Sequence, residues 1–423
     1  MRIYDLIQKK ATERVCMRIL LLGLNFSPEL VGIGKYTGDL ASHLSRQGFD
    51  LRVVTTPPYY PEWKVKVGYS GWRYQIESVG DMLVVRCPLW APRRPSNLSR
   101  IPHLLSFALS SLPVMLAQIM WKPDITFCVI PTLLSAPLAW FAARLSGAKC
   151  WLHIQDFELD AALNLGILSG KNLILSFARV FERFILSHFD RVSTISDNML
   201  TLAVQKGAAK DKTFLFPNWV DTCQIFPMQD ANPMRAELGI DDCKKVILYH
   251  GNLGRKQGLE ILIQAAARLQ AHPEILFLIC GEGAARSELE QKAMGMKNIR
   301  FIDLQPRDKL NCLVNLADVH VLPQRAGVAD LVMPSKLTTM LASGKPVLAC
   351  ASPGTQLWKV VDQVGRVVPP EDAYALSEAI IHSLDDPDAC KQLAKLARIY
   401  TCRFLDKEVI LSRFEHELRK LGS

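Results

Sequence analysis

The segment HIQDFELDA brings an imidazole and several carboxylates together directly after an apolar run of strand length. It contains His153 and Asp156, with Glu158 and Asp160 close behind. Such side chains at the end of a strand can transfer protons or bind the hydroxyl groups of a substrate. The alternative is a histidine satisfied within the fold beside a capped helix start. We take His153 and Asp156 as candidate catalytic residues.

Glycine-rich loops follow three other apolar runs, an arrangement in which backbone N–H groups can bind phosphate. One such loop is weak evidence, because glycine also permits tight turns between a strand and a helix. Three loops of the same kind are stronger evidence, and we assign them to donor binding. Their residues are Gly32, Gly34, Gly254, Gly281, Glu282 and Gly283.

Two groups of basic residues accompany these loops. Arg255 and Lys256 come directly before a predicted helix, where a diphosphate needs compensating charge. Ordinary solvated surface cations are the alternative. In PSKLTTMLASGKPV, Ser335 is predicted as a helix N-cap, Lys336 follows at once, and Gly344 ends the helix. Because anions bind readily at helix N-termini, this is a second candidate phosphate site.

The loops are expected to connect the elements of two parallel sheets. Apolar runs at 18–24 and 51–56 flank a helix predicted over 35–46, which makes a β-α-β unit. The alternation returns in KVILYH, ILFLIC, NIRFIDL, ADVHVLP and KPVLAC, as is typical of a sheet covered on both faces. The fold class is therefore α/β, with two Rossmann-like domains expected to face each other across a cleft.

Length and composition agree with two domains. The chain has 423 residues, 49% hydrophobic and 22% charged, which excludes disordered and low-complexity classes. Eleven cysteines stand singly, without C-x-x-C pairs, which indicates buried thiols in a reducing compartment and no metal site. We predict a loosely ordered extension (1–16), an N-terminal domain (17–217), a linker (218–242), a C-terminal domain (243–400) and a final amphipathic helix (401–423).

The excess positive charge lies in the first half of the chain. Residues 1–217 contain 25 Lys and Arg against 16 Asp and Glu, whereas residues 218–423 contain 25 of each. The N-terminal domain should therefore contact an anionic partner. We expect no nucleic acid, because the basic residues form no DNA-reading helix and are not interleaved with base-stacking aromatics. The charge-free run 104–120 is either a buried helix or a helix lying in a membrane interface.

Several segments together resemble glycosyltransferase family 4, retaining enzymes of the GT-B fold. The resemblance extends over nearly the whole chain from Met17. Its most specific segments are FSPELVGIGKYTGDLA, TPPYYPEWKV, HIQDFELDA, FPNW, GNLGRKQGLE and PSKLTTMLASGKPV. It implies transfer of a sugar, with GDP-fucose favoured over a UDP-sugar as donor and with no metal or cofactor. The implied acceptor is a polyprenyl-diphosphate-linked oligosaccharide of an exopolysaccharide.

The resemblance also implies where each substrate binds. The nucleotide would lie in the second domain and the acceptor in the first, and the enzyme would work in the cytoplasm at the inner face of the plasma membrane. This anionic surface and acceptor would account for the basic first half. Lys256, together with Arg255 and the N–H groups near Ser335 and Lys336, would stabilise the departing diphosphate.

The sequence departs from the family pattern at two places. The family's two glutamates fall on Leu331 and Thr339, with Asp330 one residue from the first. The arginine and lysine of its phosphate loop fall on Asn252 and Gln257. Asp330 and Thr339 therefore join the candidate donor-binding residues, and Lys256 is the nearest cation in the loop.

Two other functions remain open from the sequence. The missing glutamates favour a sugar-nucleotide-binding protein without transferase activity. A GT-B nucleotide-sugar epimerase is the second alternative, but a soluble donor alone needs no membrane contact, and the apolar, basic-flanked run 104–120 argues against it.

Overall fold

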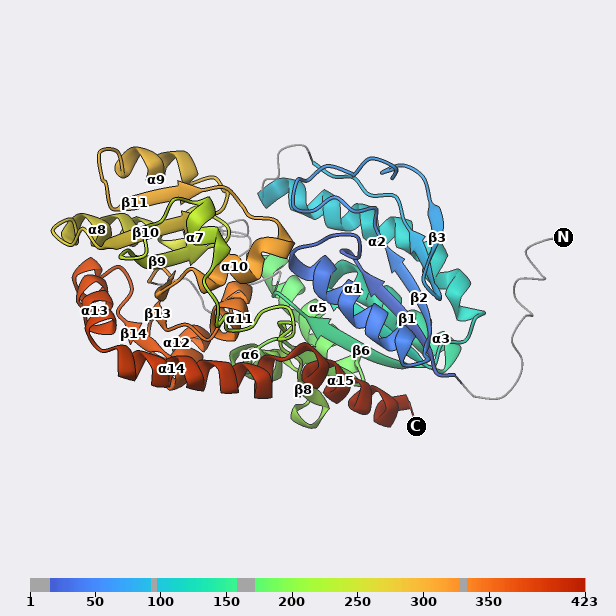
Figure 1. Ribbon diagram of the computed structural model, residues 1–423. Helices are drawn as coiled ribbons and strands as arrows, with labels where there is room; N and C mark the ends of the chain where they lie inside the picture. Colours follow the sequence, from blue (N-terminus) through green and yellow to red (C-terminus); the bar gives the residue numbers. More distant parts are fainter. Residues whose placement is uncertain (1–15, 93–96, 132, 158–171, 327–332, 423) are drawn as a thin grey trace. The chain divides into compact units, whose positions relative to one another are not determined.

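The computed structural model describes residues 16–92, 97–131, 133–157, 172–326 and 333–422 (Figure 1). The chain forms two compact units, which divide between Phe214 and Leu215, beside the predicted linker. Unit 1 comprises Met1–Thr194, Leu202–Phe214 and Glu415–Ser423; unit 2 comprises Ile195–Thr201 and Leu215–Phe414.

Unit 1 contains an eight-stranded sheet in the order β3-β4-β2-β1-β5-β6-β7-β8. The central strands are parallel, and β3 runs antiparallel to β4 at one edge. Every residue of β5 is buried, as expected for a parallel strand covered on both faces. The strands are β1 (Arg18–Gly23), β2 (Asp50–Thr55), β3 (Gln75–Val79), β4 (Met82–Arg86), β5 (Ile125–Ile130), β6 (Lys149–Ile154), β7 (Arg191–Thr194) and β8 (Thr213–Leu215).

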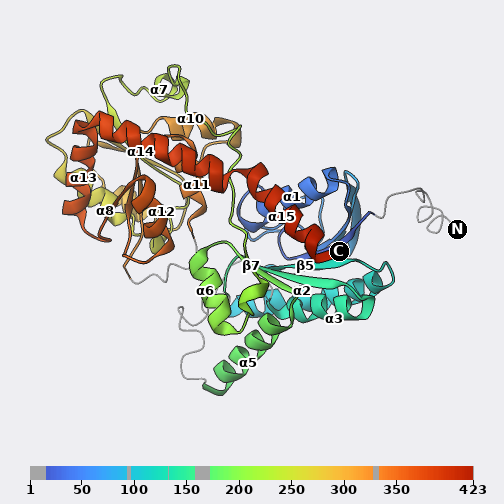
Figure 2. The ribbon, with the colours of Figure 1, turned by 90° about the horizontal axis from the view of Figure 1, so that it is seen from below.

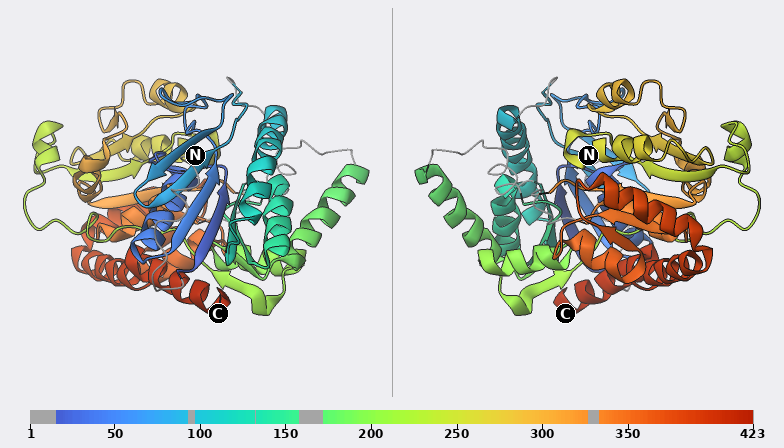
Figure 3. Two further views of the ribbon diagram at one scale, coloured as in Figure 1. Left: turned by 90° about the vertical axis from the view of Figure 1, so that its right-hand side faces the viewer. Right: turned by 90° about the vertical axis from the view of Figure 1, so that its left-hand side faces the viewer.

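Helices cover both faces of this sheet. The crossovers β1 to β2 and β4 to β5 run in opposite directions along the sheet, so their right-handed connections place α1 (Gly32–Arg46) and α2 (Asn97–Ile119) on opposite faces. Figures 2 and 3 show α3 (Ala136–Ser146) and α5 (Asn172–His188) on the same side as α2. Helix α6 (Asp197–Lys206) precedes β8.

Helix α2 corresponds to the predicted charge-free run. It packs against β2 and α3 through a buried face that includes Phe107, Ser111 and Met115. Its other face exposes apolar side chains at helical spacing: Leu105, Leu109, Leu112 and Leu116. Within the described ranges, Ser99–Ile119 is the one helical segment long and apolar enough to cross a membrane, judged by length and composition only, and 33% of its most apolar window is buried.

Unit 2 contains a six-stranded parallel sheet in the order β11-β10-β9-β12-β13-β14. All five strands predicted in this half are present. One face packs against α8 and α13, and the other against α10, α11, α12 and α14. The strands are β9 (Lys245–His250), β10 (Ile275–Cys280), β11 (Ile299–Ile302), β12 (Val319–Pro323), β13 (Val347–Cys350) and β14 (Arg366–Val368).

The helices of unit 2 follow the expected alternation with strands. They are α7 (Pro233–Glu237), α8 (Glu260–Arg268), α9 (Arg286–Lys292), α10 (Leu310–Asn315), α11 (Ser335–Ala342), α12 (Gln356–Val364), α13 (Ala373–Asp385) and α14 (Pro387–Tyr400). A π-helical turn over Thr401–Leu405 leads into α15 (Lys407–Gly422).

The end of α15 packs on unit 1, a choice that the sequence left open. Glu415 pairs with the buried His43 of α1 at 3.3 Å, and Glu417 pairs with Arg191 at 3.2 Å. Gly422 lies close to Met17, because a Cβ atom there would lie 2.5 Å from the Met17 methyl carbon and would require that side chain to shift. Long-range ion pairs and close packing therefore fix this helix.

The cysteines are only partly buried, contrary to prediction. All eleven are free thiols. Burial is confirmed for six of them: Cys87, Cys128, Cys150, Cys280, Cys350 and Cys390. Burial was wrongly expected for the four exposed ones, Cys16, Cys223, Cys243 and Cys402.

Candidate functional site

The predicted donor loops of unit 2 lie at the carboxyl edge of its sheet. From β9 the chain continues to β10 on one side of the sheet, and from β12 it continues to β13 on the other side. The strand order therefore reverses between the neighbours β9 and β12. In open α/β sheets, ligands bind outside the carboxyl ends of the strands at such a reversal. Gly251, Gly281 and the N-terminus of α11 all follow strands at this edge.

Two of the glycine loops pack closely against each other. A Cβ atom on Gly281 would overlap the Gly251 carbonyl oxygen, and one on Gly283 would lie 2.5 Å from the Leu253 carbonyl oxygen. The Gly251 N–H donates to Cys280 at 2.9 Å, and the Leu253 N–H donates to Glu282 at 2.8 Å. These contacts explain the glycines by backbone packing, and phosphate contact by Gly281, Glu282 or Gly283 stays a prediction.

The segment after the first loop keeps backbone donors available. Gly254 precedes a 3₁₀ turn over Arg255–Gln257 and accepts the Gln257 N–H at 3.0 Å. Within the described ranges, the N–H groups of Asn252 and Gly254 donate to no protein acceptor. The Arg255 side chain is exposed, and the side chain of Lys256 lies outside what the structure describes.

Helix α11 begins one position earlier than predicted. Pro334 occupies the cap position with φ −58° and ψ 124°, and Ser335 is the first helical residue. The prediction that the Ser335 side chain caps the helix is therefore wrong. Ser335 is exposed, so it offers its backbone N–H at the positive end of the helix dipole.

Lys336 is the most distinctive charged group at this edge. Its half-buried ammonium donates to the Tyr249 hydroxyl and lies 4.3 Å from the centre of the Tyr249 ring. A Cβ atom on Gly251 would lie 3.3 Å from its Nζ. Burial lowers the pKa of Lys336 to about 8. Among the residues that the structure describes, no carboxylate pairs with it, so an incoming anion would supply the missing countercharge.

A buried histidine completes this cluster, and sequence reasoning missed it. His250 Nε2 lies 3.0 Å from the Thr339 hydroxyl, which in turn donates to the Lys336 carbonyl at 2.8 Å. His250 Nδ1 is buried without a partner among the described atoms. Burial, with a smaller contribution from Lys336, lowers the pKa of His250 to about 3, so the ring is neutral. Thr339 thus holds a buried imidazole, and Asp330 lies outside the described residues.

In unit 1, the loop after β1 contains a buried carboxylate that the sequence analysis did not single out. Glu29 accepts the N–H groups of Tyr59 and Tyr60 at 3.0 and 2.9 Å and the Asn25 amide at 2.9 Å. Burial raises the pKa of Glu29, while these hydrogen bonds oppose the rise. A Cβ atom on Gly34 would overlap the Glu29 carboxylate.

Gly32 is also explained by local geometry. Its φ of +62° is in the left-handed region, and a Cβ atom there would lie 3.2 Å from the Tyr60 ring. Donor binding by Gly32 and Gly34 therefore stays a prediction, since packing alone requires both glycines. Glu29 stands within the quoted segment FSPELVGIG, where its position between apolar and glycine residues was the available signal.

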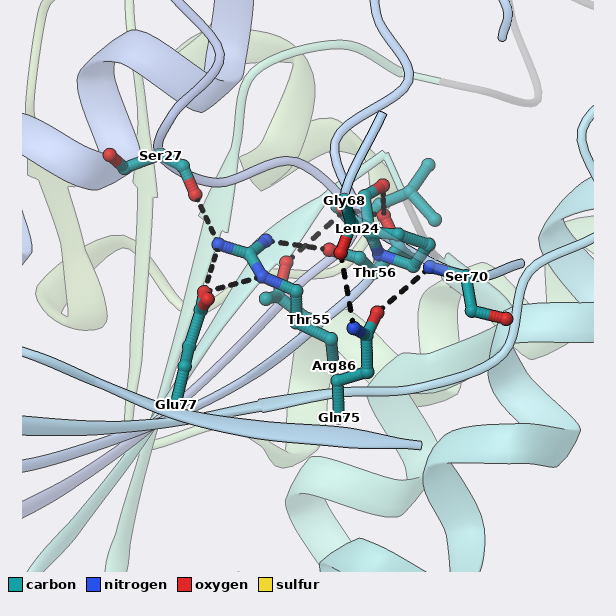
Figure 4. A network of polar contacts seen from close by, with 10 residues as sticks. Leu24, Ser27, Thr55, Thr56, Gly68, Ser70, Gln75, Glu77 and Arg86 are labelled. Atoms are coloured by element: carbon teal, nitrogen blue, oxygen red, sulfur yellow. Dashed lines mark hydrogen bonds and ion pairs between the residues drawn. The ribbon is translucent and has the colours of Figure 1, made fainter. Parts of the chain in front are cut away.

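Arg86, at the end of β4, fixes the neighbouring loops of unit 1 (Figure 4). Its buried guanidinium donates to the carbonyls of Ser27 and Thr56 at 2.6 and 2.9 Å and pairs with Glu77. It also lies 4.8 Å from the centre of the Tyr69 ring. One side chain therefore ties together the loops that follow β1 and β2.

His153 lies at the end of β6, as predicted. It is buried and stacks on Phe127, with Nδ1 at 2.9 Å from the Ser193 hydroxyl and Nε2 at 2.9 Å from the Gln155 amide. Burial lowers its pKa to about 3. This environment holds a neutral, hydrogen-bonded imidazole, which fits the alternative of a satisfied histidine, and a catalytic role stays a prediction.

The remaining residues of this segment are only partly described. Asp156 is exposed, and Glu158 and Asp160 lie outside the described residues. In the ranges that the structure covers, no three His, Cys, Asp or Glu side chains gather as metal ligands would.

Two family models match the chain. The model described as "Glycosyl transferase 4-like domain" matches residues 31–219, and the one described as "Glycosyl transferases group 1" matches residues 230–399. WcaI of Escherichia coli (strain K12), named as a colanic acid biosynthesis glycosyl transferase, is 44% identical over 95% of this chain and 100% of its own.

Solved structures share the fold. Sucrose-phosphate synthase of Thermosynechococcus elongatus superposes with a TM-score of 0.74 at 19% identity, covering 96% of this chain and 99% of that one. Anabaena HepE in complex with UDP-glucose gives a TM-score of 0.65 at 16% identity, covering 96% and 100%.

Two Rossmann-like units with these structural neighbours show the GT-B fold, and the two family models define a glycosyltransferase. The chain belongs to glycosyltransferase family 4, in which WcaI is its relative at 44% identity. The family named in the sequence analysis is thereby confirmed.

Proposed function

We propose that the protein transfers a sugar from a nucleoside-diphosphate donor to a lipid-diphosphate-linked glycan during assembly of a colanic-acid-like exopolysaccharide. The observation that supports donor binding is Lys336, a half-buried lysine at the N-terminus of α11 that pairs with no carboxylate among the residues that the structure describes. This position combines a point charge with free helix N–H groups. Both would stabilise the negative charge that develops on a departing diphosphate.

We propose GDP-fucose as the donor and transfer with retention of configuration, as the family resemblance implies. The neighbour HepE was crystallised with UDP-glucose, so a UDP-sugar is the competing donor. No metal is part of the proposal, and Lys336, Arg255 and Lys256 would supply the positive charge.

Binding to a membrane surface is the second part of the proposal, and it rests on one side of unit 1. Helices α2, α3 and α5 lie on the same face of the sheet (Figure 3) and expose apolar side chains to solvent. Basic residues flank them, which suits an anionic leaflet. The apolar residues are Leu105, Leu109, Leu112, Leu116, Phe141, Leu145, Phe177, Val180 and Phe184, and the basic ones are Arg100, Arg144, Arg179 and Arg183.

We therefore propose that the protein is peripheral at the cytoplasmic face of the plasma membrane, where a lipid-linked acceptor would be presented. We call this surface the apolar face of unit 1. Its α2 part is a continuous stripe along the helix, so it would lie in the membrane interface while the opposite side of α2 stays packed on the sheet.

Turnover of labelled donors tests the transferase reaction. Purified protein is incubated with radiolabelled GDP-fucose, UDP-glucose or UDP-galactose and a bacterial lipid-linked glycan extract, and label in the organic phase is counted. Transfer from one donor, lost in Lys336→Met, supports the proposal. Selective nucleotide binding without transfer from any donor would support the non-catalytic binder instead.

Vesicle flotation tests binding to a membrane surface. Leu109 and Leu116 are 63% and 43% exposed, so Leu109→Glu with Leu116→Glu should leave the fold intact while removing apolar contact and adding repulsion. Because a partly buried leucine is worth about 1–2 kcal/mol, we expect binding to phosphatidylglycerol vesicles to fall at least tenfold.

Leu304→Glu is the matched control, because Leu304 is 62% exposed but lies in unit 2. It should bind vesicles as the wild type does. Equal binding by the double variant and the wild type would remove the apolar face of unit 1 from the proposal.

A further inference from the structure

The loop between β2 and β3 and the segment after β4 line a hollow in unit 1 that neither the family assignment nor the donor site explains. Its volume is about 680 Å³, within the range of roughly 300–1,000 Å³ typical of small-molecule sites. Aromatic side chains dominate its lining: Trp63, Tyr69, Trp72 and Trp90. We call it the aromatic hollow.

The walls of the hollow are held by specific contacts. The Leu89 N–H donates to the Gly71 carbonyl at 2.9 Å, and a Cβ atom on Gly71 would lie 3.1 Å from the Leu89 oxygen. The Ser70 N–H donates to Gln75 at 2.8 Å (Figure 4). Tyr69 lies against the guanidinium of Arg86. The rings are therefore presented by a fixed backbone rather than by a free loop.

Trp63 is held in an unfavourable backbone conformation. Its φ of +54° is rare for a bulky side chain, and such outliers gather at functional sites. Its ring packs 5.7 Å from Tyr59 and 5.2 Å from His103, centre to centre. Tyr59, which packs against Trp63, also donates its N–H to Glu29, so it links this wall of the hollow to the buried carboxylate.

The rings of the hollow are accessible to solvent, and the lining around them is mostly uncharged. Trp72 is 81% exposed and Trp90 is 39% exposed. Among the described lining residues, Lys64 is the one charged side chain, and Ser70 adds a hydroxyl group. Flat aromatic faces with a few polar groups at the rim suit a pyranose, whose C–H face packs on a ring while its hydroxyl groups reach outward.

We propose that the aromatic hollow is a saccharide subsite that binds a pyranose unit of the acceptor glycan by stacking on Trp72 and Trp90. This inference rests on the proposed transferase function and assigns the sugar-binding part of its acceptor site. A membrane surface fits less well, because the rings line a hollow, whereas the apolar face of unit 1 already offers a stripe of exposed leucines along α2.

Ligand-observed NMR tests the subsite with sugars that carry no lipid. Full-length protein is mixed with methyl glycosides of glucose, galactose and fucose at about 10 mM, since single sugars bind with dissociation constants near the millimolar range. We expect saturation transfer to ring protons of at least one glycoside, with quenching of tryptophan fluorescence. Absence of transfer to all three would overturn the proposal.

Variants locate the binding. Trp72→Ala should weaken glycoside binding about three- to tenfold, and Trp72→Phe should restore most of it, because one stacking contact is lost and then replaced. Tyr374→Ala is the control, since Tyr374 is 59% exposed but lies on α13 of unit 2. Unchanged glycoside binding in Trp72→Ala, with weaker flotation on vesicles, would assign Trp72 to the membrane and overturn the proposal.

The nucleotide site provides an independent readout. A thermal shift with nucleoside diphosphates depends on unit 2, so Trp72→Ala should keep it. Nucleotide shifts without glycoside binding would overturn the subsite and leave the transferase standing. Glycoside binding lost in Trp72→Ala, with no nucleotide shift in the wild type, would support the subsite and contradict the transferase.

Discussion

Replacing Lys336 by methionine tests the proposed phosphate site most directly. Methionine keeps the apolar stem but lacks the ammonium that donates to Tyr249. A hydrogen bond from an ammonium to phosphate is worth about 1.5–3 kcal/mol, so its loss should raise the dissociation constant of a nucleoside diphosphate about ten- to 150-fold.

The assay is a thermal-shift panel with GDP, UDP and ADP. A ligand at about 100 times its dissociation constant stabilises the wild type by about 2.7 kcal/mol, and a variant that binds thirtyfold more weakly keeps about 0.9 kcal/mol. The shift in Tm should therefore fall to about a third. Lys345→Met is the matched control, because Lys345 is also half-buried but lies two residues before β13, at the opposite edge of the same sheet.

The ligand-free proteins give a second readout. Burial lowers the pKa of Lys336 from its usual 10.5 to about 8. This shift corresponds to a free-energy cost of the charged form of at most about 3 kcal/mol, and solvent at a half-buried site reduces that cost to about 1–2 kcal/mol. The variant should thus be no less stable at pH 7.

The pH dependence has a defined sign. Between pH 8 and 10.5 the unfolded chain keeps the Lys336 proton that the folded protein releases, so the unfolding free energy of the wild type should rise relative to the variant. An undiminished nucleotide shift in Lys336→Met, or an equal loss in Lys345→Met, would refute this assignment of the phosphate site.

Two further substitutions test the packing around the sites. Gly281→Ala should lower the unfolding free energy in urea by about 2–4 kcal/mol, because φ is +147° and a Cβ atom would overlap Gly251. Gly295→Ala is the control and should cost only about 1 kcal/mol, since Gly295 has φ +84° and no atom within 4 Å of the added Cβ. Equal costs would contradict the close approach of the two loops. Because burial lowers the pKa of His153 to about 3, the unfolded chain gains a proton below about pH 6.5 that the folded protein does not. This residue alone should lower the unfolding free energy by up to about 2 kcal/mol between pH 6.5 and 5, and His153→Asn should remove that part of the slope while buried His250 keeps its own. An unchanged slope would place His153 in a solvated environment.

The strands β9 and β10 could be predicted because parallel strands covered on both faces form continuous apolar runs, although β5, of the same kind, was not singled out. Edge strand β3, with alternating half-buried and exposed residues over Gln75–Val79, has no such run and was missed. Docking of α15 on unit 1 could not be predicted either. It depends on the pair His43–Glu415, whose partners are 372 residues apart.

Site residues could be recognised where the residues next to them in the sequence predict a helix start or a loop. Lys336 stands beside a predicted helix start, so its place at an N-terminus was accessible from the sequence. Tyr249 and His250 end an apolar strand and look like core residues until the carboxyl edge of the sheet is known. The error at Ser335 has a backbone cause, because Pro334 adopts the cap conformation itself and leaves Ser335 inside the first turn.

The packing of the glycine loops changes which groups can hold a diphosphate. The Gly281 N–H donates to the Ile302 carbonyl at 3.1 Å, whereas the N–H groups of Asn252 and Gly254 donate to no acceptor among the described residues. In the proposed site, charge comes from Lys336, whose pKa is lowered to about 8 by burial. A bound diphosphate would raise that pKa, so donor binding and full protonation of Lys336 reinforce each other.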